Sequence, residues 1–167
     1  VRTMKENAWS KLDKDEVFRF SDEYRIFLNK CKTEREVVDY IVSEAEKHGF
    51  LPIEKGGRKI YEVNRGKSVI VAVKGRKDIR EGLRIIASHA DSPRLDLKPN
   101  PLYEDEELAL LKTHYYGGIK KYHWVSIPLA IHGVVVKENG EKLNLVIGED
   151  PEDPVFTVCD LLPHLAK

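Results

Sequence analysis

The stretch that decides the fold is LRIIASHADSPRLD at residues 83–96, where an apolar run ends in a histidine and an aspartate. The apolar part is typical of a buried β-strand over residues 83–89. His89 and Asp91 are separated by one residue, so in an extended chain both side chains lie on the same face. Imidazole is a common zinc ligand, and a nearby carboxylate can fix its tautomer. The pattern predicts one corner of a metal site at the carboxyl end of a strand.

Upstream of this stretch the spacing of apolar residues predicts two helices. The first covers residues 14–30. Thr33 and Glu36 form a capping-box pattern that begins a second helix. That helix is expected to run to about His48, because Gly49 is a favourable stop. Its expected buried face consists of Val37, Val38, Ile41, Val42 and Ala45.

After Gly49 the spacing of apolar residues changes from the helical pattern to the pattern of β-strands. Residues 60–64 and 68–74 are β-rich and are joined by Asn-Arg-Gly-Lys, which predicts a hairpin. Helices followed by strands, with an apolar strand ending in polar residues, favour an α/β architecture for residues 1–93.

Residues 94–167 differ from the preceding part in their predicted secondary structure and in their net charge. Residues 108–112, 125–137 and 142–147 are β-like, and Asn139-Gly140 predicts a hairpin between the last two. Residues 1–93 carry 20 basic and 16 acidic side chains, a net charge of +4, whereas residues 94–167 have a net charge of −4. We therefore expect a domain boundary near Pro93 and a small β-rich unit after it.

The net charge, the lengths of the apolar runs and the cysteines indicate which partners and which cellular compartment to expect. The 167 residues have zero formal net charge, so the totals indicate neither nucleic acid nor an anionic membrane as a partner. No apolar run approaches membrane length. Cys31 and Cys159 lie far apart with no ligand spacing, which is typical of free thiols in a reducing compartment. We expect a cytoplasmic location.

From their sequence context alone, the other histidines are not expected to bind a metal. His48 lies in the last turn of a helix, where a cation suits the helix dipole. His132 is expected to be structural, and His114 and His123 are nine residues apart, which is no standard ligand spacing. From its apolar surroundings alone, His164 is expected to be a hydrogen-bonded core or interface histidine. A His-x-Asp pair by itself also remains a weak motif.

One long segment changes this assessment. SHADSPRLDLKPNPLYEDEELALLKTHYYGGIKKYHW at residues 88–124 closely resembles the aspartyl aminopeptidase family of zinc metallopeptidases, in particular its bacterial members. The resemblance extends over IPLAIHGV at 127–134, DPVF at 153–156 and LLPHL at 161–165. Upstream, CKTERE at 31–36 and VNRGK at 63–67 also match. The resemblance thus covers nearly the whole chain with long, ungapped motifs.

The resemblance implies an α/β catalytic domain, here residues 1–93, interrupted by a β-rich dimerisation domain that begins at residues 94–167. It implies a site with two zinc ions per complete subunit, although cobalt or manganese can occupy such N/O sites. His89 matches a zinc ligand, and Asp91 matches the carboxylate that orients it. His164 matches a histidine that enters a neighbouring subunit's site and stabilises an oxyanion. The implied substrates are peptides with acidic N-terminal residues, and the implied assembly is built from dimers, up to a dodecamer.

Family members are more than twice as long as this chain. Their bridging aspartate, general base and remaining ligands match nothing within residues 1–167. We therefore expect the N-terminal portion of an aminopeptidase that is inactive as an isolated 167-residue chain. Two alternatives stay open: a non-catalytic oligomerisation module, and a related tetrahedral aminopeptidase with a different specificity.

Overall fold

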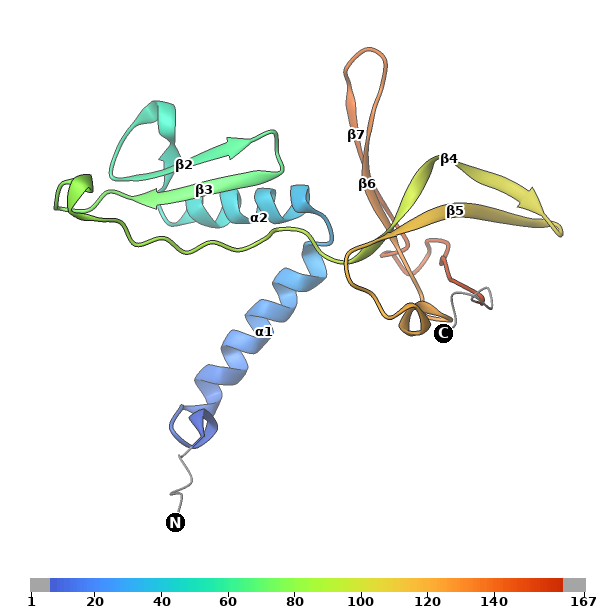
Figure 1. The fold of residues 1–167 in the computed structure, drawn as a ribbon, viewed down its shortest axis with the longest axis horizontal. Coiled ribbons are helices and arrows are strands. Elements are labelled where there is room, and N and C mark those ends of the chain that lie inside the picture. The colour runs from blue at the N-terminus through green and yellow to red at the C-terminus, as the bar shows by residue number, and fades with distance from the viewer. Residues whose placement is uncertain (1–6, 161–167) are drawn as a thin grey trace. The chain divides into compact units, whose positions relative to one another are not determined.

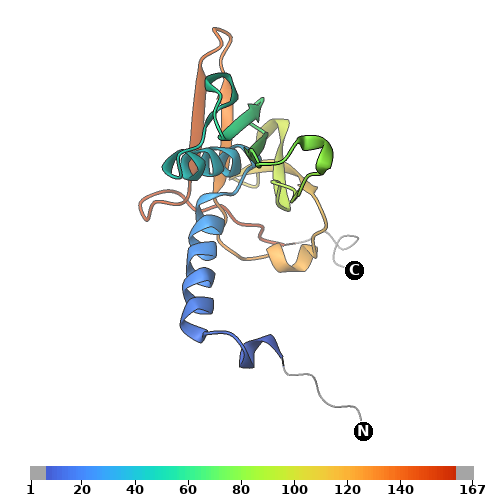
Figure 2. The same cartoon turned by 90° about the vertical axis from the view of Figure 1, so that its left-hand side faces the viewer.

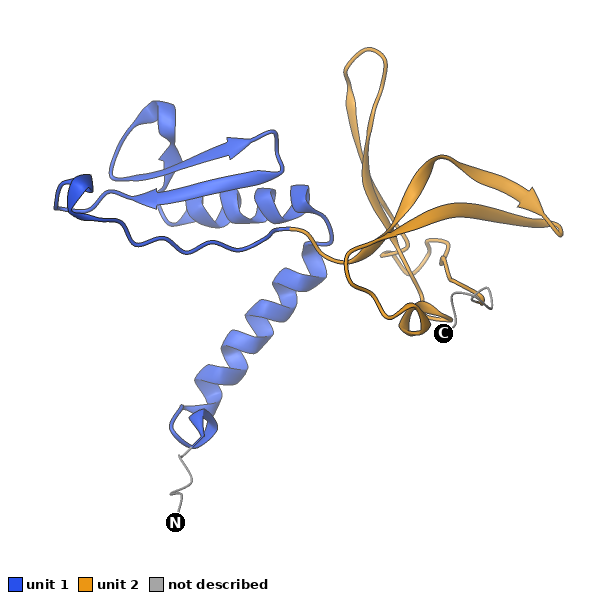
Figure 3. Ribbon diagram, viewed as in Figure 1, with its two compact units in different colours: residues 1–90 blue, residues 91–167 orange. Residues whose placement is uncertain are grey.

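The computed structural model describes residues 7–160, and the chain divides into two units, Val1–Ala90 and Asp91–Lys167 (Figure 3). The first unit contains helices α1 (Lys14–Lys30) and α2 (Glu34–Lys47) and a three-stranded sheet of β1 (Leu51–Pro52), β2 (Lys59–Asn64) and β3 (Ser68–Val73) (Figure 1). None of the helices in residues 7–160 has the length and apolar character needed to cross a lipid bilayer.

The capping box that begins α2 is confirmed. The Thr33 hydroxyl accepts a hydrogen bond from the backbone N–H of Glu36 at 3.4 Å, and Glu36 Oε2 accepts one from the backbone N–H of Thr33 at 2.8 Å. These bonds satisfy two amides that the first turn of a helix leaves without intrahelical partners. At the other end Gly49 adopts φ = +78°, and α2 ends at Lys47 as expected.

The core of the first unit lies between α2 and the sheet (Figures 1 and 2). Val38 is 1% exposed. The Tyr61 hydroxyl on β2 donates to Glu46 Oε1 on α2 at 2.6 Å, and this bond is the main cause that raises the pKa of Tyr61. The buried apolar residues of the described chain all belong to this unit: Cys31, Val37, Val38, Ala45 and Tyr61.

The predicted hairpin of β2 and β3 is also confirmed. The two strands are antiparallel, with Asn64 opposite Ser68. Arg65 and Gly66, the two central residues of the turn, have φ values of 55° and 64°. Positive φ at both positions is the geometry whose twist matches the right-handed twist of the flanking strands.

The strand predicted at residues 83–89 is wrong. The structure assigns no strand to this segment, and its apolar side chains face solvent, with Ile85 78% and Ile86 100% exposed. An apolar run becomes a strand only when a neighbouring strand satisfies its backbone N–H and C=O groups. No strand within residues 7–160 pairs with it.

The second unit contains two separate antiparallel pairs (Figure 1). One pair joins β4 (Arg94–Asp105) to β5 (Leu108–Tyr116), and the other joins β6 (Ile131–Val136) to β7 (Lys142–Ile147). The hairpin predicted at Asn139-Gly140 is therefore confirmed. The strand predicted at 125–137 is shorter than expected, because only Ile131–Val136 pairs continuously.

Strand β4 was absent from the sequence-based prediction. Its sequence contains Pro99 and Pro101, which argue against a strand because proline cannot donate a ladder hydrogen bond. The structure accommodates them where the pairing register shifts between Leu97 and Leu102. A bulge of this kind leaves residues unpaired and so tolerates the missing donors.

We predict that Thr33→Ala lowers the free energy of unfolding by about 1 kcal/mol, because an amide of the first turn of α2 loses its acceptor. Thr33→Ser keeps the hydroxyl and is the matched control, for which we expect most of the stability to remain. Urea denaturation measures both. Equal losses for the two variants would contradict a capping role.

Candidate metal site

The two residues predicted to form the metal corner lie on either side of the boundary between the units. His89 is exposed and follows the unpaired segment of the first unit. Asp91 is half-buried and is the first residue of the second unit. Only Ala90 lies between these two residues in the chain. Their side chains are therefore attached to neighbouring parts of the backbone by covalent connectivity alone.

Asp91 is held by the end of β5. The hydroxyl of Tyr116 donates a hydrogen bond to Asp91 Oδ2 at 2.6 Å. This distance is in the range of charge-assisted O–H···O⁻ bonds. Tyr116 is the last residue of its strand and lies opposite Arg94, the first residue of β4.

Arg94 fixes the ring of Tyr116 from the neighbouring strand. Its guanidinium carbon lies 4.1 Å from the ring centroid, which is a cation–π contact. The same guanidinium pairs with Asp96 through Nε and Oδ1 at 2.7 Å. It also donates to the backbone carbonyl of Ser92 at 3.4 Å. Arg94 therefore connects the residues that follow Asp91 to the ring that holds Asp91.

A glycine permits this close arrangement. Gly117 adopts φ = +80°, and a Cβ atom at this position would lie 3.3 Å from the Cα atom of Pro93. A side chain would therefore meet both a strained backbone conformation and the proline. Gly118, the next residue, has nothing within 4 Å of such an atom.

The donor chemistry of this corner suits a metal, but the number of donors does not complete a site. A histidine nitrogen supported by a carboxylate is typical of zinc sites. Within residues 7–160, however, no three side chains of the His, Cys, Asp or Glu types are grouped so that they could hold an ion. Among the described residues, His89 and Asp91 therefore remain candidates for one ligand and its supporting carboxylate, and do not form a complete site.

The remaining described histidines lie in other contacts. The His48 ring is 2.8 Å from the backbone carbonyl of Glu44, through Nδ1. His132 Nε2 lies 3.0 Å from Glu149 Oε1. His114 stacks on Tyr115, with ring centroids 5.3 Å apart. His164 lies outside the described residues.

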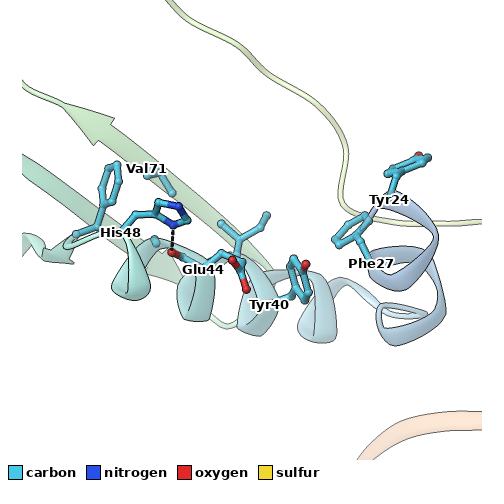
Figure 4. Close-up of a pocket in the computed structure, with 9 residues that line it drawn as sticks. Tyr24, Phe27, Tyr40, Glu44, His48 and Val71 are labelled. Carbon is cyan, nitrogen blue, oxygen red and sulfur yellow. Dashed lines mark hydrogen bonds between the residues drawn. The ribbon is translucent and has the colours of Figure 1, made fainter. Parts of the chain in front are cut away.

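An apolar groove of about 390 Å³ lies on the first unit (Figure 4). Aromatic rings from both helices contribute to its lining, among them Phe27 and Tyr40, whose centroids are 5.2 Å apart. Neither His89 nor any residue of the segment before it lines this groove. The groove is thus separate from the metal corner.

Comparison with known proteins agrees with the metallopeptidase interpretation. The family model described as "Aminopeptidase I zinc metalloprotease (M18)" matches residues 27–167. The chain belongs to the M18 family of aminopeptidases. The resemblance noted from the sequence motifs is therefore confirmed at the level of the family.

Curated M18 relatives are similar along almost all of the chain. "Probable M18 family aminopeptidase 1" of Thermotoga maritima is 52% identical over 172 residues, covering 100% of this chain and 38% of the relative. The protein with the same description from Clostridium acetobutylicum is 51% identical and covers 96% of this chain and 37% of the relative. The chain thus spans somewhat more than a third of the length of these relatives.

Solved M18 structures share the fold. A crystal structure of an M18 aminopeptidase from Thermotoga maritima matches with a TM-score of 0.88 and 50% identity, covering 99% of this chain and 38% of that one. Aminopeptidase I from Borrelia burgdorferi matches with a TM-score of 0.87 and 46% identity, over 95% of this chain and 41% of that one. The chain therefore has the fold of the corresponding part of an α/β aminopeptidase, as predicted.

Tyr116 is the residue of this corner that sequence reasoning missed. Its partner lies 25 residues earlier in the chain, so no local spacing connects them. The available signal was the glycine pair that directly follows the tyrosine. Paired glycines after a strand indicate a place where backbones approach closely.

We predict that Gly117→Ala lowers the free energy of unfolding by about 1–2 kcal/mol, because an L-residue is strained at positive φ. The contact with Pro93 adds to this cost. Gly118→Ala is the matched control and is expected to leave stability nearly unchanged. Urea denaturation compares the two; a loss at Gly118 as large as that at Gly117 would contradict the close approach.

Proposed function

We propose that a polypeptide of the relatives' length containing this chain is a metal-dependent aminopeptidase that removes N-terminal residues, acidic ones in particular, from peptides. The observation that carries the proposal is the match to the zinc metalloprotease family across residues 27–167, which contain the His89-x-Asp91 corner. The acidic preference comes from the resemblance to aspartyl aminopeptidases.

In this proposal His89 is a metal ligand and Asp91 orients its imidazole. The proposed site holds two zinc ions per complete subunit, with cobalt or manganese as chemically possible substitutes. When bound, zinc supplies Lewis acidity, which polarises carbonyl groups and lowers the pKa of water. The part played by Asp91 is to fix the ring nitrogen that faces the metal and to raise its basicity.

The isolated 167-residue chain is proposed to be inactive. Its described residues hold no group of three candidate ligands, which supports the view that the site needs donors other than His89. A glutamate base outside the metal shell, which such hydrolysis requires, is likewise not assigned to any residue of this chain.

His164 is proposed to act in a neighbouring subunit. There it would donate a hydrogen bond to the oxyanion that develops when water attacks the peptide carbonyl. The residue is thus catalytic only in an oligomer, for which we propose a dimer as the building block and a dodecamer as the full assembly. We place the enzyme in the cytoplasm, consistent with Cys31 and Cys159 being free thiols.

A non-catalytic assembly role is the second candidate. It is favoured by the apolar residues that the β6–β7 pair leaves exposed, with Val136 61% and Val146 51% exposed. Exposed apolar strands are typical of surfaces that associate. Assembly without metal or peptidase activity would support this candidate over the first.

We predict that His89→Ala removes zinc from the polypeptide of the relatives' length and abolishes peptide hydrolysis, because a metal ligand is lost. Asp91→Asn should weaken zinc binding about 10- to 100-fold, since it removes the supporting charge. His114→Ala is the matched control, with zinc retained. Metal analysis after dialysis and hydrolysis of aminoacyl substrates measure these effects. Full zinc content in His89→Ala would refute the ligand assignment.

We predict that His164→Ala lowers kcat about 10²- to 10³-fold while zinc content stays the same, because an oxyanion donor acts mainly in the transition state. Steady-state kinetics on an N-terminal aspartyl peptide measures the change. A variant that instead loses zinc would place His164 among the ligands.

A further inference from the structure

We propose that Tyr116 is a positioning residue for Asp91, so that the β4–β5 hairpin of the second unit sets the orientation of the carboxylate two residues after His89. The inference rests on the proposed function, in which Asp91 orients a metal-ligating imidazole. It adds a residue from a different part of the chain and assigns it a specific task.

The bond itself has the geometry that this task needs. The Tyr116 hydroxyl lies 2.6 Å from Asp91 Oδ2 and donates to it. A carboxylate with one oxygen held in this way loses free rotation about its terminal torsion, which is otherwise broad. The direction of the second oxygen, Oδ1, is then also set. Since an ionised aspartate accepts at both oxygens, the bond to Tyr116 is compatible with a second bond to an imidazole.

The hydroxyl is held in place by structure that does not depend on a metal. Backbone pairing with Arg94 fixes the end of β5, and the guanidinium 4.1 Å from the ring centroid restrains the ring. Arg94 is in turn held by its 2.7 Å pair with Asp96. Gly117 brings the next backbone segment against Pro93. A side chain supported from several directions is what a precise binding site requires of the residues behind its ligands.

The adjacent tyrosine offers a matched control. Tyr115 lies opposite Leu95 in the ladder, so its side chain is on the other face of the hairpin from Tyr116. Its ring contacts Lys121 Nζ, 4.9 Å from the centroid, and stacks with His114. Both contacts use the ring and not the hydroxyl, so Tyr115→Phe preserves them.

The experiment uses the polypeptide of the relatives' length and two readouts besides activity. The first is the zinc dissociation constant, measured by competition with a chromophoric chelator. The second is the visible absorption spectrum of the cobalt(II) form, which reports ligand geometry. We expect Tyr116→Phe to weaken zinc binding about three- to tenfold, less than the 10- to 100-fold typical of a direct supporting partner. It should also alter the cobalt spectrum, while Tyr115→Phe changes neither.

A double-mutant cycle separates positioning from a general structural role. If Tyr116 acts through Asp91, then Tyr116→Phe has no further effect on zinc affinity in an Asp91→Ala background, which leaves no acceptor for the Tyr116 hydroxyl at this position. Thermal unfolding of each variant is followed in parallel. We expect Tyr116→Phe to lower the midpoint of unfolding, because it loses the hydrogen bond to Asp91, and Tyr115→Phe to leave the midpoint nearly unchanged.

Two results would overturn the inference while leaving the proposed function intact. One is that Tyr116→Phe and Tyr115→Phe bind zinc equally well with the same cobalt spectrum. The other is that Tyr116→Phe weakens zinc binding as much with alanine at position 91 as with aspartate. A different result, unchanged zinc binding in His89→Ala, would overturn the proposed function and the inference with it.

Discussion

The pairing of Arg94 with Tyr116 is the interaction on which the candidate site depends. It brings the end of β5 back to the residues that immediately follow Asp91. The hydroxyl of Tyr116, the guanidinium of Arg94 and the backbone of Gly117 all reach residues 91–96 because of this one register. A shift of the register by one residue would turn Tyr116 to the opposite face of the hairpin and bring Tyr115 into its place.

The first unit shows what happens to apolar sequence that lacks a neighbour. Val38 on α2 is almost fully buried, whereas Ile86 is fully exposed. Both residues belong to segments rich in aliphatic side chains. The difference is that α2 satisfies its own backbone hydrogen bonds, while a strand needs a second strand to do so. The segment before His89 is therefore the part of the described chain whose composition and environment agree least.

Much of the local structure was predictable from the sequence. The capping box of α2 and the two β-hairpins depend on residues within a few positions of one another, and each was found where expected. The prediction failed in two places. Strand β4 was missed because Pro99 and Pro101 are unfavourable in a strand, and a bulge accommodates them. The strand at 83–89 was expected from composition alone, which does not supply a partner.

In the candidate site, too, some features follow from local sequence and others only from the tertiary structure. The sequence by itself determined the His89-x-Asp91 spacing and the family, because consecutive residues are held together by covalent bonds and long motifs are specific. Only the tertiary structure decided that Tyr116 holds the carboxylate of Asp91, because 25 residues separate the two side chains. A contact between residues so far apart in the sequence depends on the strand register and on the bulge that β4 contains. Neither is encoded by any short pattern, since both arise when two strands pair along their whole length.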